Sequence, residues 1–270
     1  MTDLILQASQ LVKTYHQRSG TLGLQQHSLR ALDDVSLQLR RGSTLAVVGE
    51  SGSGKSTLAR GLMRLLPLDS GEVVFDGQDF LALDKQKLRS ARRDIQMVFQ
   101  DPFASLNPRM RVADIVAEGL VIHRIGNSRQ QQAQVIEMLE KVGLSAADAQ
   151  KYPHQFSGGQ RQRIGIARAL ILQPKLVICD EPVSALDVSV QAQILLLLKQ
   201  LQQEMGLSYL FITHDLRVVR HIADEVLVMQ KGKVIEQGSV ETIYNAPQQI
   251  YTQQLLDAIP GHAARTQQSA

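Results

Sequence analysis

The sequence has a single cysteine, no tryptophan and no long apolar segment. With Cys179 alone, neither a disulfide nor a cysteine-based metal cluster can form within one chain, and this residue is expected to pack as a small apolar side chain. No apolar run approaches the roughly 18 residues that a membrane-spanning helix needs, and the N-terminal residues lack the basic and apolar regions of a secretory signal. These absences exclude a disulfide-stabilised secreted domain and predict a soluble protein of cytoplasmic character.

The sequence also lacks a marked excess of either charge. It contains 29 lysine and arginine residues against 26 aspartate and glutamate residues. The basic residues are scattered, so the composition does not predict nucleic-acid binding. The hydrophobic fraction of 44% and the charged fraction of 20% are ordinary for a globular protein of one or two domains with an ample core.

The most informative segment is a glycine-rich loop at residues 49–56, which matches the pattern G-x-x-x-x-G-K-S/T. An apolar, β-branched run at residues 44–48 precedes it and predicts a buried strand, and leucines at helical spacing follow over residues 57–66. Strand, glycine loop and helix are the context of a phosphate-binding loop, whose glycines let backbone N–H groups wrap the phosphates. Lys55 would reach the β- and γ-phosphates, and the hydroxyl of Ser56 would ligate Mg²⁺.

A second candidate site lies at residues 176–181, where four apolar residues run into two carboxylates. The pattern places Asp180 and Glu181 at the exit of a buried strand, the edge of a parallel sheet at which ligands bind. Asp180 is a candidate for holding Mg²⁺, and Glu181 for polarising the water that attacks the γ-phosphate. Taken alone, the segment leaves open the alternative of a strand that ends in two solvated acids.

Further motifs stand in a fixed order around these two sites, and together they carry a resemblance. They are Walker A at Gly49–Ser56, a Q-loop at Gln100, a signature at Phe156–Gln160, Walker B at Leu176–Glu181, a D-loop at Ser184–Asp187 and a switch-histidine loop at Thr213–Asp215. In this order the chain resembles the ATP-binding cassette (ABC) ATPases over nearly its whole length, with Phe156 where leucine is commoner. The resemblance implies an α/β fold: a P-loop NTPase (RecA-like) core with an antiparallel β subdomain and an inserted α-helical subdomain.

The resemblance also implies a role for each matching residue. ATP binding falls to Tyr15, which stacks on adenine, and to Gly49, Glu50, Ser51, Gly52, Ser53, Gly54, Lys55, Ser56 and Thr57. Mg²⁺ is held by Ser56, Gln100 and Asp180; the catalytic residues are Glu181, His214 and Gln100; the D-loop contributes Ser184 and Asp187. From the residues alone, Tyr15 could instead be a strand-edge aromatic packed on the core, and His214 a structural or surface histidine.

The signature, Ser157, Gly158, Gly159 and Gln160, precedes an apolar helix whose N-terminal amides favour an anion. The resemblance implies that Ser157 and Gly159 of one subunit cap the γ-phosphate bound by the opposite subunit. ATP would then join two cassettes head to tail, and hydrolysis would release them.

The spacing of apolar residues predicts how the chain is organised. Helices are expected over residues 112–120, 131–142 and 189–205, and a tight hairpin at Lys231-Gly232. We predict one ABC ATPase domain over residues 1–260: a nucleotide-binding α/β core from 1–100 and 166–235, a helical subdomain at 101–165 and an importer-type C-terminal element at 236–260. Residues 261–270 are predicted to be disordered.

The helical region opens with Gln100–Arg109, which resembles the oligopeptide, dipeptide and nickel importer subclass. Three further features agree with this subclass: a loop of about a dozen residues at Gln17–Ser28, the D-loop continuation Ser184–Ile194 and the C-terminal segment Tyr244–Pro260. Gln249-Ile250 departs from the subclass, which typically has His-Pro there. The residues of this sequence do not include the cysteine-bearing extension of some members, so no iron–sulfur cluster is expected.

The subclass implies the ATP-hydrolysing subunit of a membrane importer, peripheral on the cytoplasmic face of the inner membrane. Its partners would be a second, different ABC ATPase subunit, two integral-membrane permease subunits and an extracytoplasmic substrate-binding protein, with no nucleic acid. The cargo stays open between peptides, nickel or a metal chelate, and glutathione-like molecules. A soluble ABC ATPase acting on ribosomes or DNA is disfavoured by the single cassette without heptad runs. A regulatory cassette that binds ATP without turnover is disfavoured by the complete catalytic set.

Overall fold

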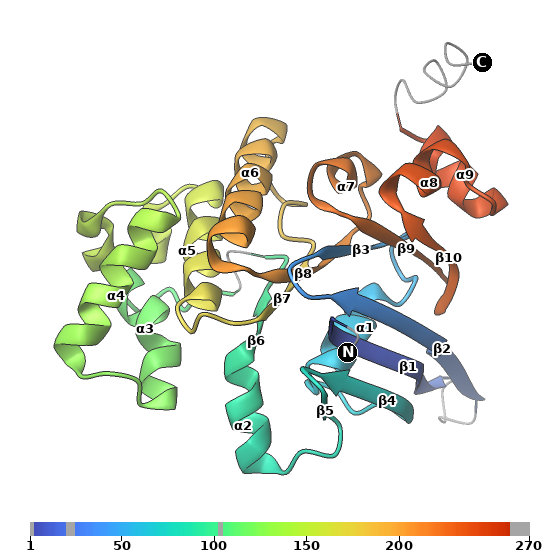
Figure 1. The fold of residues 1–270 in the computed structure, drawn as a ribbon, viewed down its shortest axis with the longest axis horizontal. Helices are drawn as coiled ribbons and strands as arrows, with labels where there is room; N and C mark the ends of the chain where they lie inside the picture. Colours follow the sequence, from blue (N-terminus) through green and yellow to red (C-terminus); the bar gives the residue numbers. More distant parts are fainter. Residues whose placement is uncertain (1–2, 20–24, 102–104, 260–270) are drawn as a thin grey trace. The chain divides into compact units, whose positions relative to one another are not determined.

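The computed structural model describes residues 3–19, 25–101 and 105–259. The chain divides into two compact units, the first from Met1–Leu83 together with Leu210–Ala270 and the second from Asp84–Tyr209 (Figure 1). The boundary falls within strand β8 (Ser208–Thr213). Part of the Gln100–Arg109 segment and the tail predicted to be disordered lie outside the described residues.

The first unit contains a four-stranded antiparallel sheet in the order β2-β1-β4-β5. Strand β1 (Leu4–Ser19) lies between β2 (Gln25–Arg40) and β4 (Ser70–Phe75), and β5 (Gln78–Asp79) is the short edge strand. Residues on one face of β2, at positions 35, 37 and 39, are buried and alternate with exposed polar residues. This alternation places one face of the sheet on an apolar core.

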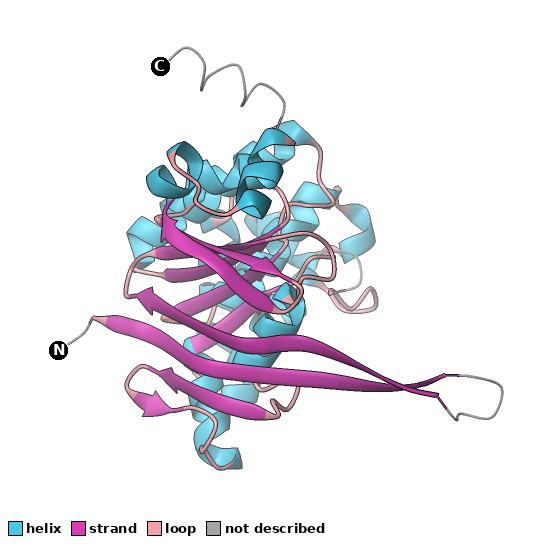
Figure 2. Ribbon diagram, turned by 90° about the vertical axis from the view of Figure 1, so that its right-hand side faces the viewer, coloured by secondary structure: helices cyan, strands magenta, loops and turns pink. Residues whose placement is uncertain are grey.

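The loop expected at Gln17–Ser28 is largely strand. The register of β1 and β2 continues through Gln17↔His27 to Ser19↔Gln25, so the two strands form one long ribbon (Figure 2). Backbone hydrogen bonds extend an antiparallel pair whatever the side chains are. The prediction was wrong because these polar residues lack the apolar alternation that marks a half-buried strand.

The strands beside the glycine loop form a second group in the first unit, in the order β10-β9-β3-β8. Strand β3 (Thr44–Val48) is parallel to β9 (Glu225–Gln230), which pairs antiparallel with β10 (Lys233–Ser239). All residues of β3 are buried, which confirms the strand predicted from its apolar run. Because β3 is covered on both faces, the loop that follows starts from a rigid support.

The hairpin predicted at Lys231-Gly232 is confirmed, with Lys233 of β10 paired to Gln230 of β9. Both turn residues have positive φ, 47° and 82°, as a two-residue turn of type I′ requires. The Gly232 N–H donates to the carbonyl of Ser53 at 2.9 Å, and the Gly232 carbonyl accepts from the N–H of Asp33 at 2.8 Å. The turn therefore bonds directly to the glycine loop.

Three short helices cover the β3–β9 pair: α7 (Leu216–Ile222), α8 (Val240–Asn245) and α9 (Ile250–Asp257). Val48 and Val228 from the strands pack in one cluster with buried residues of the helices: Leu216, Val219, Ile243, Tyr244 and Leu256. The predicted C-terminal element is thus folded onto the strand that leads into the phosphate loop.

Helix α9 begins at Ile250, at the position where the resembled subclass has proline. The N–H of the first helical residue has no partner within the helix, so proline loses no hydrogen bond there. Gln249, the residue before it, has φ −96° and ψ 133°, an extended conformation of the kind required of a residue that precedes proline. Ile250 is 73% exposed, so its side chain contributes little packing. We expect Ile250→Pro to raise the free energy of unfolding by about 0.4–1 kcal/mol, because proline restricts the unfolded chain. Urea titration measures this, with Ile250→Ala as the control; a less stable proline variant would contradict the described start of α9.

The second unit begins with a basic helix and then forms the helices expected before the signature. Its elements are α2 (Lys85–Asp94), β6 (Ile95–Val98), α3 (Val112–His123), α4 (Ser128–Lys141) and two 3₁₀ helices, η1 (Ala146–Gln150) and η2 (Pro153–Gln155). The helices predicted at residues 112–120 and 131–142 are confirmed as α3 and α4. Helix α2 was not predicted, because none of its residues is buried and it has no apolar stripe.

The remainder of the second unit supports the signature and the acidic strand end. Helix α5 (Gly158–Leu170) follows the signature serine, and β7 (Leu176–Asp180) runs parallel to β6. Helix α6 (Val188–Met205) confirms the prediction at residues 189–205, and its apolar stripe is buried. Cys179 of β7 is fully buried, and burial raises the pKa of its thiol, so it packs as an apolar residue as expected. Within the described ranges, no helix has both the length and the hydrophobicity to cross a bilayer.

Candidate nucleotide site

The glycine loop connects β3 to helix α1 (Lys55–Leu62) in the first unit. Gly49 has φ 152°, and a Cβ there would lie 2.2 Å from the carbonyl oxygen of Met229. Gly54 has φ 107°, and a Cβ there would lie 2.3 Å from the carbonyl oxygen of Ala31. Crowding and backbone conformation therefore both require glycine at these two positions. The helical spacing predicted a helix as far as residue 66, but α1 ends at Leu62. Two residues later Arg64 has a positive φ of 51°, which is not a helical conformation.

Lys55 is the first residue of α1, and its charged group is turned into the loop. Its side chain is almost fully buried, and Nζ donates to the carbonyls of Gly49 at 2.7 Å and Glu50 at 2.8 Å and to Oγ of Ser53 at 3.4 Å. The start of a helix also presents unpaired N–H groups and partial positive charge. An ammonium group and helix amides at one loop form a site for a phosphate chain.

Two other predicted residues belong to the same unit. Tyr15 is in β1 opposite Leu29 and is 39% exposed, with Nζ of Lys13 5.9 Å from its ring centroid. Part of its ring is therefore exposed and can be stacked on, as the predicted role in adenine binding requires. His214 follows β8 directly and is exposed, and Asp215 beside it caps α7 by accepting from the N–H of Arg217 at 2.9 Å. Its position at the end of a buried strand is the one predicted.

The second unit brings Gln100 and Glu181 together. They follow the parallel neighbours β6 and β7, so both lie at the carboxyl ends of those strands, where Nε2 of Gln100 donates to Oε2 of Glu181 at 3.0 Å. Glu181 has a positive φ of 47°, a conformation that costs energy for a residue with a Cβ. Asp180 is the last residue of β7 and is 5% exposed. A buried carboxylate beside a strained one favours a functional strand end over two solvated acids.

The signature residues form the start of α5 in the same unit. Oγ of Ser157 accepts from the N–H of Gln160 at 3.4 Å, and Oε1 of Gln160 accepts from the N–H of Ser157 at 3.0 Å, so the two residues form a capping box. A Cβ at Gly159 would lie 2.4 Å from Cγ1 of Val190 in α6, which explains the glycine by packing. The capping box was readable as S-x-x-Q before an apolar helix, whereas the contact of Gly159 with Val190 was not, and both features give these residues a structural role beside the predicted one.

The D-loop residues shape the turn between β7 and α6. Oγ of Ser184 donates to the carbonyl of Glu181 at 3.1 Å, which links the D-loop to the strained residue. Asp187 precedes the first residue of α6, and its carbonyl accepts from the N–H of Gln191 at 2.8 Å. The turn is thus held by hydrogen bonds at its start and its end.

One residue at the glycine loop was missed. The hydroxyl of Tyr251, from α9, accepts from the N–H of Glu50 at 3.1 Å. The two residues are 201 positions apart in the sequence, and no spacing pattern predicts such a contact.

Comparison with known proteins identifies the family to which these features belong. A family model described as ABC transporter matches residues 32–184. The chain belongs to the ABC transporter family. Among relatives of this family, the dipeptide transport ATP-binding protein DppF of Haemophilus influenzae is 52% identical over 256 residues, which cover 95% of this chain and 78% of the relative. The oligopeptide transport ATP-binding protein AppF of Bacillus subtilis is 50% identical over 259 residues, which cover 96% and 79% of the two chains.

Solved structures of ABC proteins have the same fold. The ATP-binding cassette MJ0796, in a dimeric post-hydrolysis state with ADP and Pi, is 31% identical, with a TM-score of 0.76 over 87% of this chain and 98% of that one. CbiO1 of Clostridium perfringens, part of the ABC transporter complex cbiONQ, is 28% identical, with a TM-score of 0.79 over 98% and 99%. The chain is therefore an ATP-binding ABC ATPase with the mixed α/β fold, antiparallel sheet and helices that the motifs implied.

Proposed function

We propose that this ABC ATPase energises a membrane importer of peptides. The observation that carries the proposal is an identity of about half of all residues, over nearly the whole chain, with ATP-binding proteins named for dipeptide and oligopeptide transport. The predicted site residues support it, since the loop, the acidic strand end, the signature and the switch histidine are all complete. Nickel or a metal chelate and glutathione-like molecules are the other cargoes that the subclass resemblance leaves open.

The proposed cycle uses two copies of the site. Lys55 and the α1 amides bind the phosphates of ATP, Tyr15 stacks on adenine, and Ser157 and Gly159 of a second ATPase subunit cap the γ-phosphate. Closure of the pair drives the permease, and loss of the γ-phosphate reopens it. Glu181 accepts the proton of the attacking water, while His214 orients that water.

The residues assigned to Mg²⁺ suit it chemically. Ser56, Gln100 and Asp180 offer hydroxyl, amide and carboxylate oxygens, the donors that Mg²⁺ prefers. The amide nitrogen of Gln100 donates to Glu181, so its oxygen is the atom left to ligate a cation. When bound, Mg²⁺ would neutralise charge on the phosphate oxygens.

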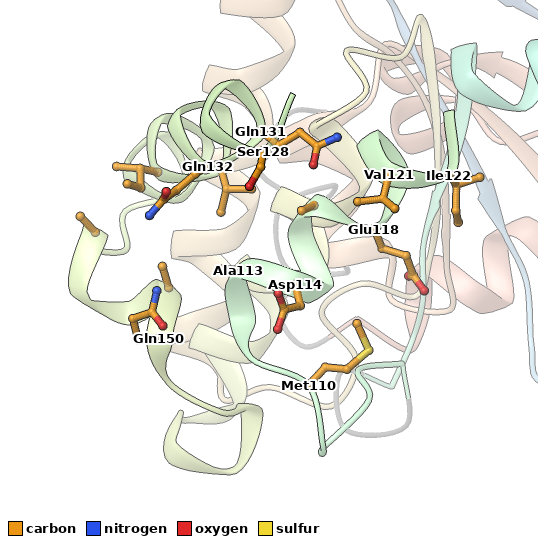
Figure 3. A pocket seen from close by; sticks show the side chains of 15 residues that line it. Met110, Ala113, Asp114, Glu118, Val121, Ile122, Ser128, Gln131, Gln132 and Gln150 are labelled. Atoms are coloured by element: carbon orange, nitrogen blue, oxygen red, sulfur yellow. The ribbon is translucent and has the colours of Figure 1, made fainter. Parts of the chain in front are cut away.

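A groove in the second unit supports the assignment of a membrane partner. It lies between α3, α4 and η1 and has a volume of about 530 Å³. Val121 and Ile122 line it while 59% and 48% exposed, and Asp114 and Glu118 on the same helix are exposed carboxylates (Figure 3). Exposed apolar side chains beside exposed surface charge mark an interaction surface. We assign the groove to a short helix of a permease subunit that carries basic residues toward the two acids.

The test is affinity purification of the tagged chain from detergent-solubilised native membranes, followed by mass spectrometry. We expect two multi-span permease subunits and a second, related ATPase. Val121→Glu should lose the permeases while keeping the ATPase activity of the isolated chain, because it replaces an apolar contact in the groove with a carboxylate that would be desolvated against the apolar face of the docked helix. Leu196→Glu, on an apolar residue of α6 that is also largely exposed, is the control and should retain them.

Each outcome separates one claim from the others. Permeases retained by Val121→Glu would contradict the groove but not the importer. Ribosomal or DNA-processing proteins in place of permeases would overturn the importer and favour the soluble ATPase. Stimulation of the purified assembly by its binding protein loaded with peptide, compared with nickel, identifies the cargo.

A further inference from the structure

The C-terminal helices contact the catalytic loops of the first unit through two phenol groups. Tyr251 of α9 accepts from the N–H of Glu50 in the phosphate loop, at 3.1 Å. Tyr244 of α8 donates to the carbonyl of Leu216, the first residue of the helix that follows His214. Tyr244 is part of an apolar cluster that also contains Val48, the last residue of β3, and Tyr251 packs against this cluster. The C-terminal element is therefore anchored in the core and reaches the nucleotide site.

Tyr251 acts on the peptide unit between Gly49 and Glu50. The N–H of this unit donates to the hydroxyl of Tyr251, and its carbonyl, that of Gly49, accepts from Nζ of Lys55 at 2.7 Å. A trans peptide is planar and points its N–H and C=O in opposite directions. Fixing the N–H therefore fixes the direction of the carbonyl that holds Lys55.

The surroundings of α9 make this contact well defined. Tyr244 is buried, its hydroxyl is bonded to Leu216, and the guanidinium of Arg220 lies 4.3 Å from its ring centroid, so α8 is held in place. Tyr251 packs against the same cluster as Leu255 and Ile259 of its own segment. Burial raises the pKa of Tyr251, and its phenol therefore stays neutral at physiological pH.

We propose that Tyr251 is a positioning residue for ATP binding, through which the C-terminal element holds the phosphate loop in its binding conformation. The inference rests on the assignment of Lys55 to the phosphates. It gives the element a role in this chain that needs no contact with a membrane partner: helix α9 tunes the affinity of the chain for ATP. Movement of α9 by a partner would then be transmitted to the loop through a single hydrogen bond.

The test is Tyr251→Phe, which keeps the ring in the cluster and removes only the acceptor. We expect KM for ATP to rise about three- to tenfold, the range that corresponds to one hydrogen bond, with kcat within about twofold of wild type. Equilibrium titration with a labelled ATP analogue should show the same loss of affinity. Steady-state phosphate release at varied ATP concentration gives both kinetic parameters on the full chain.

The neighbouring residue provides a matched control. Thr252 is on the same helix, and among the described residues its buried hydroxyl has no hydrogen-bond partner. Thr252→Val should leave KM and kcat unchanged, because it removes a hydroxyl that positions nothing. Unchanged KM in Tyr251→Phe would overturn the proposal, as would an equal rise in KM in Thr252→Val. Absence of turnover in the wild-type chain would instead count against the ATPase cycle and not against Tyr251, whose effect the binding titration still reports.

Discussion

Glu181→Gln is expected to bind ATP normally and to lose nearly all turnover, with kcat lower by about 10²- to 10⁴-fold, the contribution of a general base. Glutamine has the same shape and can still accept from Nε2 of Gln100, but its amide cannot take a proton from water. The positive φ of 47° at this position is equally unfavourable for glutamate and glutamine, so the folded structure should be unchanged. Phosphate release at saturating ATP measures the loss, and titration with a labelled ATP analogue measures the retained binding.

A matched substitution separates catalysis from charge. Glu204→Gln makes the same chemical change at an exposed position near the end of α6 and should hydrolyse ATP at the wild-type rate. Turnover close to wild type in Glu181→Gln would mean that the general base is another residue.

Lys55→Ala is expected to lose nucleotide binding itself. Each hydrogen bond from the ammonium to a charged phosphate contributes about 1.5–3 kcal/mol, so we expect affinity to fall by about a hundredfold or more. The alanine also releases the carbonyls of Gly49 and Glu50 that Nζ now holds, which loosens the loop. Equilibrium titration with a labelled ATP analogue measures the change.

The control for this variant is Arg60→Ala, which removes an exposed cation from the same helix and should bind ATP like wild type. A Lys55→Ala chain that bound ATP with near wild-type affinity would contradict the assignment of the loop to phosphate binding.

Local sequence patterns predicted the elements whose structure depends on the burial or the conformational preference of their own residues. The buried strand β3 and the long helix α6 follow from runs and periods of apolar residues. The Lys231-Gly232 turn follows from glycine at a position that needs positive φ. The pairing of Gln100 with Glu181 follows from the rule that parallel strands end at the same edge, once both strands are recognised.

The missed features depend on backbone or tertiary contacts. The outer part of the β1–β2 ribbon is held by main-chain hydrogen bonds between polar residues, so its side chains show no period. Helix α2 buries no residue, and its local signal is the Asp84 cap that accepts from the N–H of Lys87. Tyr251 reaches the phosphate loop because α9 folds back onto β3, which only the three-dimensional structure reveals.

The β9–β10 turn has a consequence for protein engineering. Surface hairpin turns commonly tolerate an inserted tag or reporter. Here the Gly232 N–H bonds to the carbonyl of Ser53, and a Cβ at Gly232 would lie 2.8 Å from the carbonyl oxygen of Arg30, so the turn is locked to the phosphate loop. A reporter inserted between Lys231 and Gly232 would therefore distort the phosphate loop. The label would lower the ATP binding and turnover of the enzyme that it was meant to report on.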